Sequence, residues 1–259
     1  MISIEVVDFT ALIAFWLCFT RWIAIMIQLP IFDNVSIPMV VKILATLLIT
    51  YAFFPYLSGE IIKDINYVGV DQFWILTIFN TVVGLLIGFL VKSIMQMFIG
   101  SGSIVTRQIG FAMLMNFDPN AATRIGPFEK LIHWTVLILI LTSGALIPMF
   151  RGALGSFFSI HIYDIGKIAQ SPQYFVELFK GIFLSSLLLA SPLIFGNVFI
   201  MVVLGIIARM VPQMNVIMVS FVVNIGLGLV IFLACSDEFF RVAFKLYTEK
   251  LGEWFQFVS

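Results

Sequence analysis

The feature that most constrains the fold of this chain is a series of long apolar runs. A helix needs ~20 mostly apolar residues to cross a bilayer, and each run comes close to this length. A lone strand would leave its backbone polar groups unpaired in lipid, so we predict an all-α, polytopic helical membrane protein. The predicted spans are Phe9 to Leu29, Ile37 to Leu57, Phe73 to Val91, Leu131 to Phe150, Ile182 to Ala208 and Val216 to Cys235.

The composition excludes the water-soluble classes of protein. Hydrophobic residues make up 61% of the chain and charged residues 11%, whereas a soluble domain has about 25% charged residues. The formal net charge is zero, so the sequence lacks the basic excess of a nucleic-acid binder. The connection from Ser58 to Gln72 carries charges of both signs, and we predict that it is solvated.

The sequence gives little support for catalysis or for a bound cofactor. The chain has two histidines, His133 and His161, and neither has a second His or a Cys at metal-binding spacing. Cys18 and Cys235 lie in apolar runs, where thiols act as small hydrophobic groups. Nucleophile elbows, phosphate loops and zinc-protease helices are also missing. We therefore predict that the chain is not an enzyme and holds no metal or cofactor.

Two basic residues lie within or at the edge of the predicted membrane helices. An ionised group there costs ~2.5–3.5 kcal/mol on insertion scales, so its side chain is expected to face protein or water. Lys42 is near a helix start, where a lysine can extend its ammonium group to the membrane surface. Arg21 is followed by Trp22 and a further apolar turn, so we predict that Arg21 has a partner within the protein.

A polar stripe follows the third predicted span. Its members, separated by three or four residues, fall on one face of a helix: Lys92, Gln96, Gly100, Ser103 and Arg107. Two interpretations remain open, an amphipathic helix at the membrane surface and a helix that lines an aqueous path or a subunit seam. Within the preceding span, the four-residue spacing of Gly84 and Gly88 permits a close helix approach.

An unusual loop is predicted after this stripe. Gly110 and the pair Asp118-Pro119 are turn signals, yet the residues between them are nearly all apolar. Such a loop should be enclosed by protein, either as a deformable seal across a pore or as a segment packed permanently in a core. Methionine suits the first alternative because its side chain is adaptable. The apolar residues are Phe111, Met113, Leu114, Met115 and Phe117.

The last two spans are predicted to form a helical hairpin. The first of them contains Pro192, which should bend the helix, and the turn comprises residues 209–215. After Cys235 an amphipathic helix is predicted, lying at the membrane surface or docking on a partner. Its apolar stripe consists of Phe240, Phe244, Tyr247, Leu251, Trp254 and Val258.

Three groups of residues, in order along the chain, resemble the motifs of one known family. The first is Arg21, then Leu29-Pro30-x-Phe32 and Ile37-Pro38-x-x-Val41-Lys42. The second is Gln108-x-Gly110-Phe111-x-Met113, followed by Asp118-Pro119. The third is Leu189-Ala190-x-Pro192, followed by Arg209-x-x-Pro212-Gln213-x-Asn215. Together they resemble the FliR family of type III secretion export-gate subunits, and the resemblance covers nearly the whole chain.

The resemblance implies a helical assembly around a central pore, in which one such chain joins several copies of FliP and FliQ. It implies a FliP-like part at residues 1–180, with the plug loop at about 110–119. A FliQ-like hairpin at 181–236 and an amphipathic helix at 237–259 follow. It also favours the pore-sealing interpretation of the loop, with Gly110, Asp118 and Pro119 as hinges. FlhB and FlhA are implied as further neighbours, and unfolded flagellar export substrates as the cargo.

The resemblance further implies roles for two sets of polar residues. The hairpin turn and its subunit contacts would involve Arg209, Pro212, Gln213 and Asn215. The helical assembly would also provide protein partners for a second set of residues: Arg21, Gln96, Ser103, Arg107 and Gln108.

Together these inferences predict a structural and gating subunit of the flagellar protein-export channel. It would be a multi-pass protein of the bacterial inner membrane, within the flagellar basal body. One alternative is the homologous export-gate subunit of an injectisome. Another is a secondary transporter for a small solute, which the proline- and glycine-interrupted helices would suit. A transporter of this kind predicts an internal repeat, and the sequence does not contain an evident one.

Overall fold

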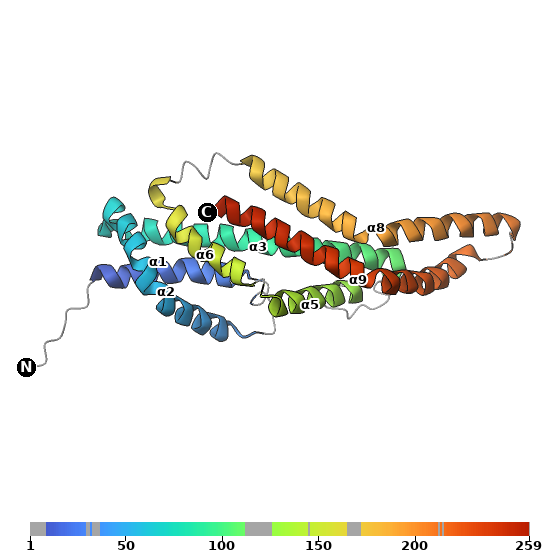
Figure 1. Cartoon of the computed structure of the whole chain (residues 1–259), viewed down its shortest axis with the longest axis horizontal. Helices are drawn as coiled ribbons and strands as arrows, with labels where there is room; N and C mark the ends of the chain where they lie inside the picture. The colour runs from blue at the N-terminus through green and yellow to red at the C-terminus, as the bar shows by residue number, and fades with distance from the viewer. Residues whose placement is uncertain are drawn as a thin grey trace, which may run out of the picture. The chain divides into compact units, whose positions relative to one another are not determined.

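The computed structural model describes residues 9–29, 32, 37–111, 126–144, 146–164, 172–211, 213 and 215–258. Helices account for nearly all of these residues, and no strand occurs among them, which confirms the predicted fold class. The elements are α1 (Phe9–Met26), α2 (Met39–Val68), η1 (Val70–Gln72), α3 (Phe73–Ile109), α5 (Pro127–Thr142), α6 (Leu146–Ser159), η2 (Ile162–Asp164), α8 (Pro172–Met210) and α9 (Val216–Val258) (Figure 1).

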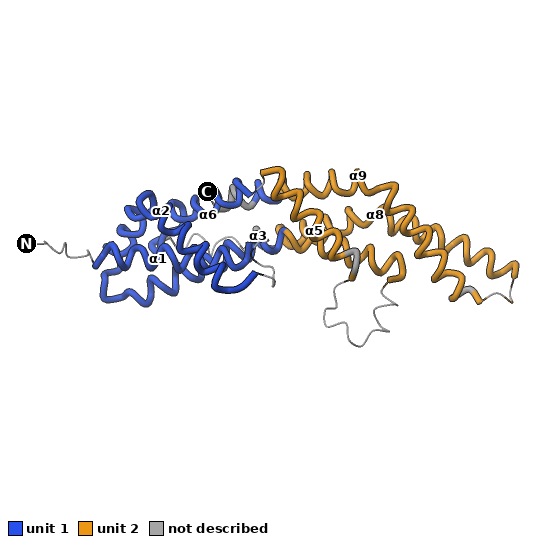
Figure 2. Tube along the Cα trace, turned by 90° about the horizontal axis from the view of Figure 1, so that it is seen from below, with its two compact units in different colours: residues 1–94, 145–176, 250–259 blue, residues 95–144, 177–249 orange. Residues whose placement is uncertain are grey.

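The chain divides into two compact units (Figure 2). Unit 1 comprises residues 1–94, 145–176 and 250–259, and unit 2 comprises residues 95–144 and 177–249. Helices α3, α8 and α9 each contribute residues to both units. The resemblance also predicted a FliP-like part at residues 1–180, a FliQ-like hairpin at 181–236 and a final helix at 237–259. That division refers to similarity with other proteins rather than to compactness, and it stays a prediction.

The core of unit 1 forms around α1. Trp22 is fully buried, and its ring packs against the rings of Phe53, Phe150 and Phe157 at centroid distances of 6.1, 6.4 and 5.8 Å. Helices α1 and α3 approach closely, because a Cβ atom at Gly84 would lie 2.5 Å from the carbonyl oxygen of Arg21. The predicted use of small residues for close helix packing is therefore confirmed at this position.

The core of unit 2 forms where the end of α3 meets α8 and α9. Val105 and Ile109 of α3 are buried together with Ala190 and Leu193 of α8. Partly buried residues packed against this cluster are Ile104, Phe111, Ile194, Ile225, Ile231 and Phe232. We call these ten residues the α3-end cluster.

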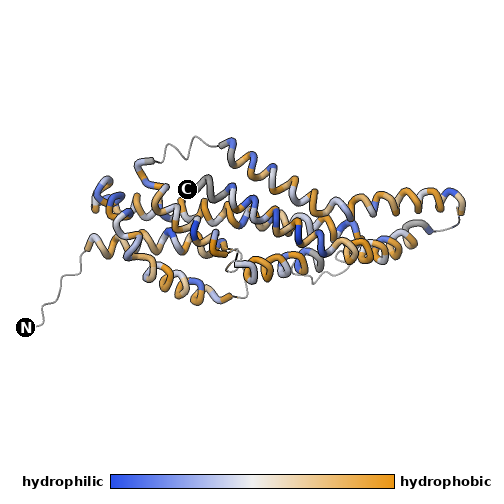
Figure 3. The backbone as a smooth tube through the Cα atoms, in the orientation of Figure 1, coloured by the Kyte–Doolittle hydropathy of each residue, from blue (hydrophilic) through white to orange (hydrophobic). Residues whose placement is uncertain are grey.

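The described helices have the length and hydropathy of a multi-pass membrane protein. Five of them are long and apolar enough to cross a membrane, or up to six if α5 and α6 form one interrupted span. Hydrophobic residues line most of the helical segments (Figure 3). Only 28% of the most apolar part of α8 and 6% of that of α9 are buried within the chain. Most of that surface must therefore face lipid or another protein.

Three predicted boundaries were wrong. The third span continues through the polar stripe, because α3 is one helix from Phe73 to Ile109. The predicted span from Leu131 to Phe150 is broken, since α5 ends at Thr142 and Gly144 adopts a positive φ of 73°. Residues 58–68 are not a loop but the last turns of α2, stabilised by an ion pair between Lys63 and Glu60 at 2.7 Å.

Helix α8 bends, as its internal proline predicts. Pro192 lies near the middle of α8, and Figure 1 shows this helix changing direction near its middle. A proline removes one backbone hydrogen bond and its ring clashes with the preceding turn, which together bend a helix.

Candidate functional site

The predicted plug loop begins where α3 ends, at Gly110. This residue has a φ of 92°, a left-handed conformation that favours glycine, and its N–H donates to the Arg107 carbonyl at 3.1 Å. Phe111, the next residue, is half-buried and packs against the α3-end cluster. The other predicted plug residues lie outside the described part of the chain: Met113, Leu114, Met115, Phe117, Asp118 and Pro119.

An asparagine of α8 binds the last turn of α3. The amide nitrogen of Asn197 donates to the Gln108 carbonyl oxygen at 2.9 Å and also to the Gln108 side-chain oxygen Oε1. The last four carbonyl oxygens of a helix have no N–H donor within the helix, so they need donors from outside it. Asn197 supplies such a partner at the base of the loop.

Close packing surrounds this contact. A Cβ atom at Gly228 of α9 would lie 2.9 Å from Cγ1 of Ile109 and 3.4 Å from its Cα. A Cβ atom at Gly196 of α8 would lie 2.6 Å from Cδ1 of Ile231 on α9. Small residues thus let the hairpin helices approach each other and the end of α3.

The chain re-enters the described structure beside the same turns of α3. A Cβ atom at Gly126 would lie 2.6 Å from Cγ2 of Thr106. The Gly126 N–H donates to the Glu129 carboxylate at 3.1 Å, an arrangement that caps the start of α5. On α3, a Cβ atom at Gly102 would lie 2.7 Å from the Cα of Glu129. The two glycines that flank the segment 111–125 therefore both lie at the last turns of α3: Gly110 directly follows the helix, and Gly126 packs against Thr106.

Arg21 is buried and has hydrogen-bond partners within the protein. It is 1% exposed, and its three nitrogens donate to Asn80 Oδ1 at 2.9 Å, to the Ser156 carbonyl at 2.8 Å and to the Ile160 carbonyl at 3.3 Å. The guanidinium carbon lies 4.6 Å from the Phe157 ring centroid. Since the two carbonyls belong to the end of α6, the cation also stabilises that helix terminus.

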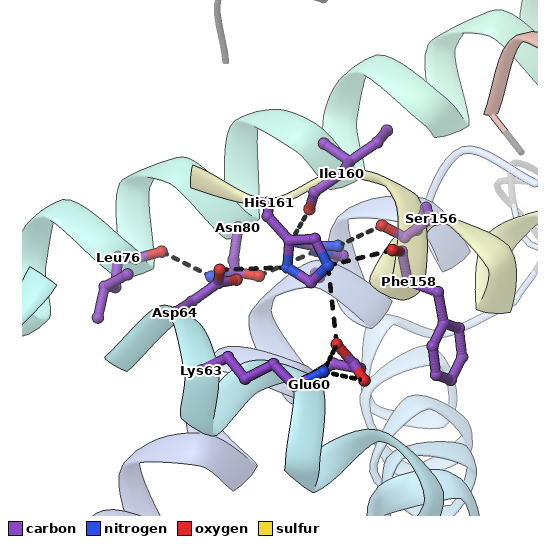
Figure 4. Close-up of polar contacts among 10 residues, drawn as sticks. Glu60, Lys63, Asp64, Leu76, Asn80, Ser156, Phe158, Ile160 and His161 are labelled. Atoms are coloured by element: carbon purple, nitrogen blue, oxygen red, sulfur yellow. Dashed lines mark hydrogen bonds and ion pairs between the residues drawn. The ribbon is translucent and has the colours of Figure 1, made fainter. Parts of the chain in front are cut away.

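A second polar group lies in the same unit. His161 Nδ1 is 3.2 Å from Asp64 Oδ1, and Nε2 is 3.1 Å from the Phe158 carbonyl oxygen and 3.8 Å from Glu60 Oε2 (Figure 4). The imidazole ring stacks on Tyr163 at a centroid distance of 4.9 Å. These contacts fasten the end of α2 to the segment that follows α6.

The other four polar residues to which the resemblance gives partners, three in the stripe and Gln108 after it, are exposed or half-buried within the chain. Gln96 and Arg107 are exposed, and Ser103 is half-buried. Gln108, also half-buried, is the one that contacts Asn197. The two interpretations of the stripe stay predictions.

The hairpin turn joins α8 to α9. Helix α8 ends at Met210 and α9 begins at Val216. Asn215 Oδ1 accepts a hydrogen bond from the Met218 N–H at 3.3 Å and so caps α9. Arg209 and Gln213 are exposed, and Pro212 lies outside the described residues.

Sequence reasoning did not identify the hydrogen-bonding partners of these polar residues, because the partners are distant along the chain. Asp64 and His161 are 97 residues apart, and Gln108 and Asn197 are 89 apart. The available signal was the rarity of polar side chains in these runs, which indicates a buried partner but does not identify it. Where the chain is described, no group of three or more His, Cys, Asp and Glu residues is placed to hold a metal ion.

Comparisons with known proteins find similarity to bacterial export proteins. A family model described as "Bacterial export proteins, family 1" matches residues 12–249. The flagellar biosynthetic protein FliR of Escherichia coli (strain K12) is 25% identical over 243 residues, which cover 90% of each chain. FliR of Bacillus subtilis (strain 168) is 24% identical over 244 residues, 91% of this chain and 90% of the relative. The surface presentation of antigens protein SpaR of Shigella flexneri is 26% identical over 200 residues, 74% of this chain and 75% of the relative.

Proposed function

The chain belongs to the bacterial export proteins, family 1, and we propose that it is a structural and gating subunit of a flagellar type III protein-export channel. In this proposal it is a multi-pass protein of the bacterial inner membrane and of the flagellar basal body. Support for the flagellar setting comes from the FliR relatives, which match over nine tenths of their length. The similarity to SpaR supports the injectisome subunit as the second candidate.

The gating role rests on one observation, the position of both flanking glycines of an apolar segment beside the same helix end. Gly110 directly follows the last residue of α3 and Gly126 lies against Thr106 of the same helix, and the segment between them is rich in Met, Phe and Leu. A segment held at both ends can seal a pore, and its adaptable side chains allow it to deform when a substrate passes. The gate comprises Gly110 to Pro119, and the cargo is an unfolded export substrate.

The partners of this subunit are FliP and FliQ, with FlhB and FlhA as further neighbours. Support comes from the apolar surface of α8 and α9, of which little is covered within the chain. The helices of other subunits would bury this surface, with residues 1–180 in FliP-like contacts and 181–236 in FliQ-like contacts. Contacts at the turn involve Arg209 and Gln213, which are exposed. The subunit itself carries out no reaction.

Replacing the seal tests the gating role. When residues 111–117 are changed to small polar residues in the assembled gate, ion leakage across the membrane should rise, because water and ions cross a polar loop more readily. A variant that exchanges only Met113 and Met115 for Leu keeps the segment apolar and should stay tight. Unchanged leakage in an assembled gate with the polar loop would disprove the seal.

Co-isolation tests the structural role. A tagged chain should copurify with two other small helical membrane proteins, whereas a transporter would purify alone or as a homo-oligomer. Deleting the gene should abolish flagellar motility in the flagellar case. Loss of secretion into host cells with intact motility would instead identify the injectisome subunit.

A further inference from the structure

A small cavity lies within unit 2, next to the base of the predicted seal. It is formed by the end of α3 together with α8 and α9, and its volume is about 10 Å³, about the space that one water molecule requires. Its walls are mostly aliphatic, supplied by Ile109, Leu193, Ile200 and Ile231. Three amides also face it, those of Gln108, Asn197 and Asn224.

Two of these amides carry buried oxygens that accept no hydrogen bond from any residue the structure describes. They are Oδ1 of Asn197 and Oδ1 of Asn224, and Asn224 as a whole is 8% exposed. A buried polar atom without a partner is unfavourable, so native proteins satisfy such atoms with protein groups or with ordered water.

The orientation of the Asn197 amide follows from its contacts. Its nitrogen faces two acceptors, the carbonyl oxygen and Oε1 of Gln108. Exchanging the nitrogen and oxygen positions would place Oδ1 against both of those oxygens, which is repulsive. The Asn197 nitrogen is therefore used by Gln108, and Oδ1 is the atom available to a molecule in the cavity. As an acceptor, Oδ1 requires a hydrogen-bond donor.

We propose that the cavity binds one water molecule, and that this water and the three amides form a latch that holds the base of the seal closed. The water donates to Asn197 Oδ1 and Asn224 Oδ1, while Asn197 donates to Gln108. A metal cation suits the site less well, because it requires about six oxygen ligands and the remaining walls are aliphatic. The latch joins α8 and α9 to the last turn of α3, two residues before Gly110.

The latch regulates the same seal, so this inference rests on the proposed function. The apolar surroundings strengthen the hydrogen bonds of the latch, because bulk water does not compete for them. The latch holds Gln108, two residues before Gly110, so disrupting it should favour the open gate. Loss of one such hydrogen bond corresponds to an about fivefold change in the ratio of open to closed gates.

The test replaces the two asparagines in the assembled gate. Asn224→Leu and Asn197→Leu each remove a latch oxygen while keeping a similar side-chain size. Each should raise ion leakage about fivefold, and should raise the reactivity of a Met113→Cys thiol by a similar factor in a chain without Cys18 and Cys235. Asn66→Leu, at an exposed position of α2 in unit 1, is the matched control and should change neither quantity. If Asn224→Leu does not assemble, Asn224→Ala removes the same oxygen without added bulk.

The outcomes separate this inference from the proposed function. If the polar-loop gate leaks while the assembled Asn224 and Asn197 variants stay as tight as the unmodified gate, the seal stands and the latch is wrong. If the polar-loop gate does not leak, the proposed function itself fails. A high-resolution structure of the closed gate should show solvent density between Asn197 and Asn224, and an empty cavity there would overturn the bound water.

Discussion

Arg21 is a buried cation whose three nitrogens each have an acceptor, on α3 and at the end of α6. Changing Arg21→Met should lower the free energy of unfolding by ~3–5 kcal/mol, because three buried acceptor oxygens lose their charged donor at once. Thermal unfolding of the purified gate in detergent measures this effect. Arg241→Met is the control, since its side chain is 78% exposed and its ion pair with Glu238 lies at the surface. Equal losses of stability in the two variants would contradict the role assigned to Arg21.

Gly110 illustrates a constraint set by backbone conformation rather than by contacts. Its φ of 92° costs other residues about 1–2 kcal/mol, so Gly110→Ala should lower stability and increase ion leakage from the gate. Gly59 lies inside α2, where an added Cβ atom meets open space, and Gly59→Ala should raise stability by up to about 1 kcal/mol. We therefore predict that the two substitutions change the stability of the protein in opposite directions. This prediction is wrong if both variants unfold at a lower temperature than the unmodified protein.

At the scale of helices, the close packing of α1 against α3 depends on Gly84. A Cβ atom there would lie 2.5 Å from a backbone oxygen of α1 and 2.8 Å from the Ala24 Cβ. The backbone cannot rotate away as a flexible side chain can, so Gly84→Ala should destabilise unit 1 by about 1–3 kcal/mol. Gly155→Ala, with open space around the new methyl group, is the comparison in the same unit. A Gly84→Ala protein with an unchanged unfolding temperature would rule out this packing constraint.

Helix positions could be predicted from the sequence because hydrophobic runs are local signals, and most of the predicted spans coincide with described helices. Local signals failed where a distant partner decides the structure. Asp64 was expected in a solvated connection, but it is 2% exposed because His161 and Arg21 are nearby. The apolar run from Leu131 to Phe150 concealed the break at Gly144, since a single positive φ leaves no trace in hydropathy. At the candidate site Gln108 and Gly110 were found from the sequence, but Asn197 and Asn224 were not.

At the scale of the whole molecule, α9 exposes two chemically different surfaces. Its C-terminal part carries charged side chains in ion pairs, such as Lys245 with Glu249 at 3.8 Å. Its N-terminal part exposes Val222, Val230 and Leu233 at 69%, 62% and 76%. Ionised groups need water or a protein partner, whereas the apolar part needs lipid or another subunit. The two parts should therefore differ in their access to water in the assembled gate.

Single cysteines measure this difference. In a chain whose own two cysteines are replaced, Lys245→Cys should react with a membrane-impermeant maleimide, and Val230→Cys should not. If neighbouring subunits rather than lipid cover the apolar part, Val230→Cys should also resist a lipid-soluble maleimide in the full gate. It should react with that reagent when the chain is produced without its partners. Equal reaction in both preparations would mean that lipid covers this surface, and the proposed packing of α9 against other subunits would fail. Protection only in the full gate would instead explain why 6% of the most apolar part of α9 is buried within the single chain.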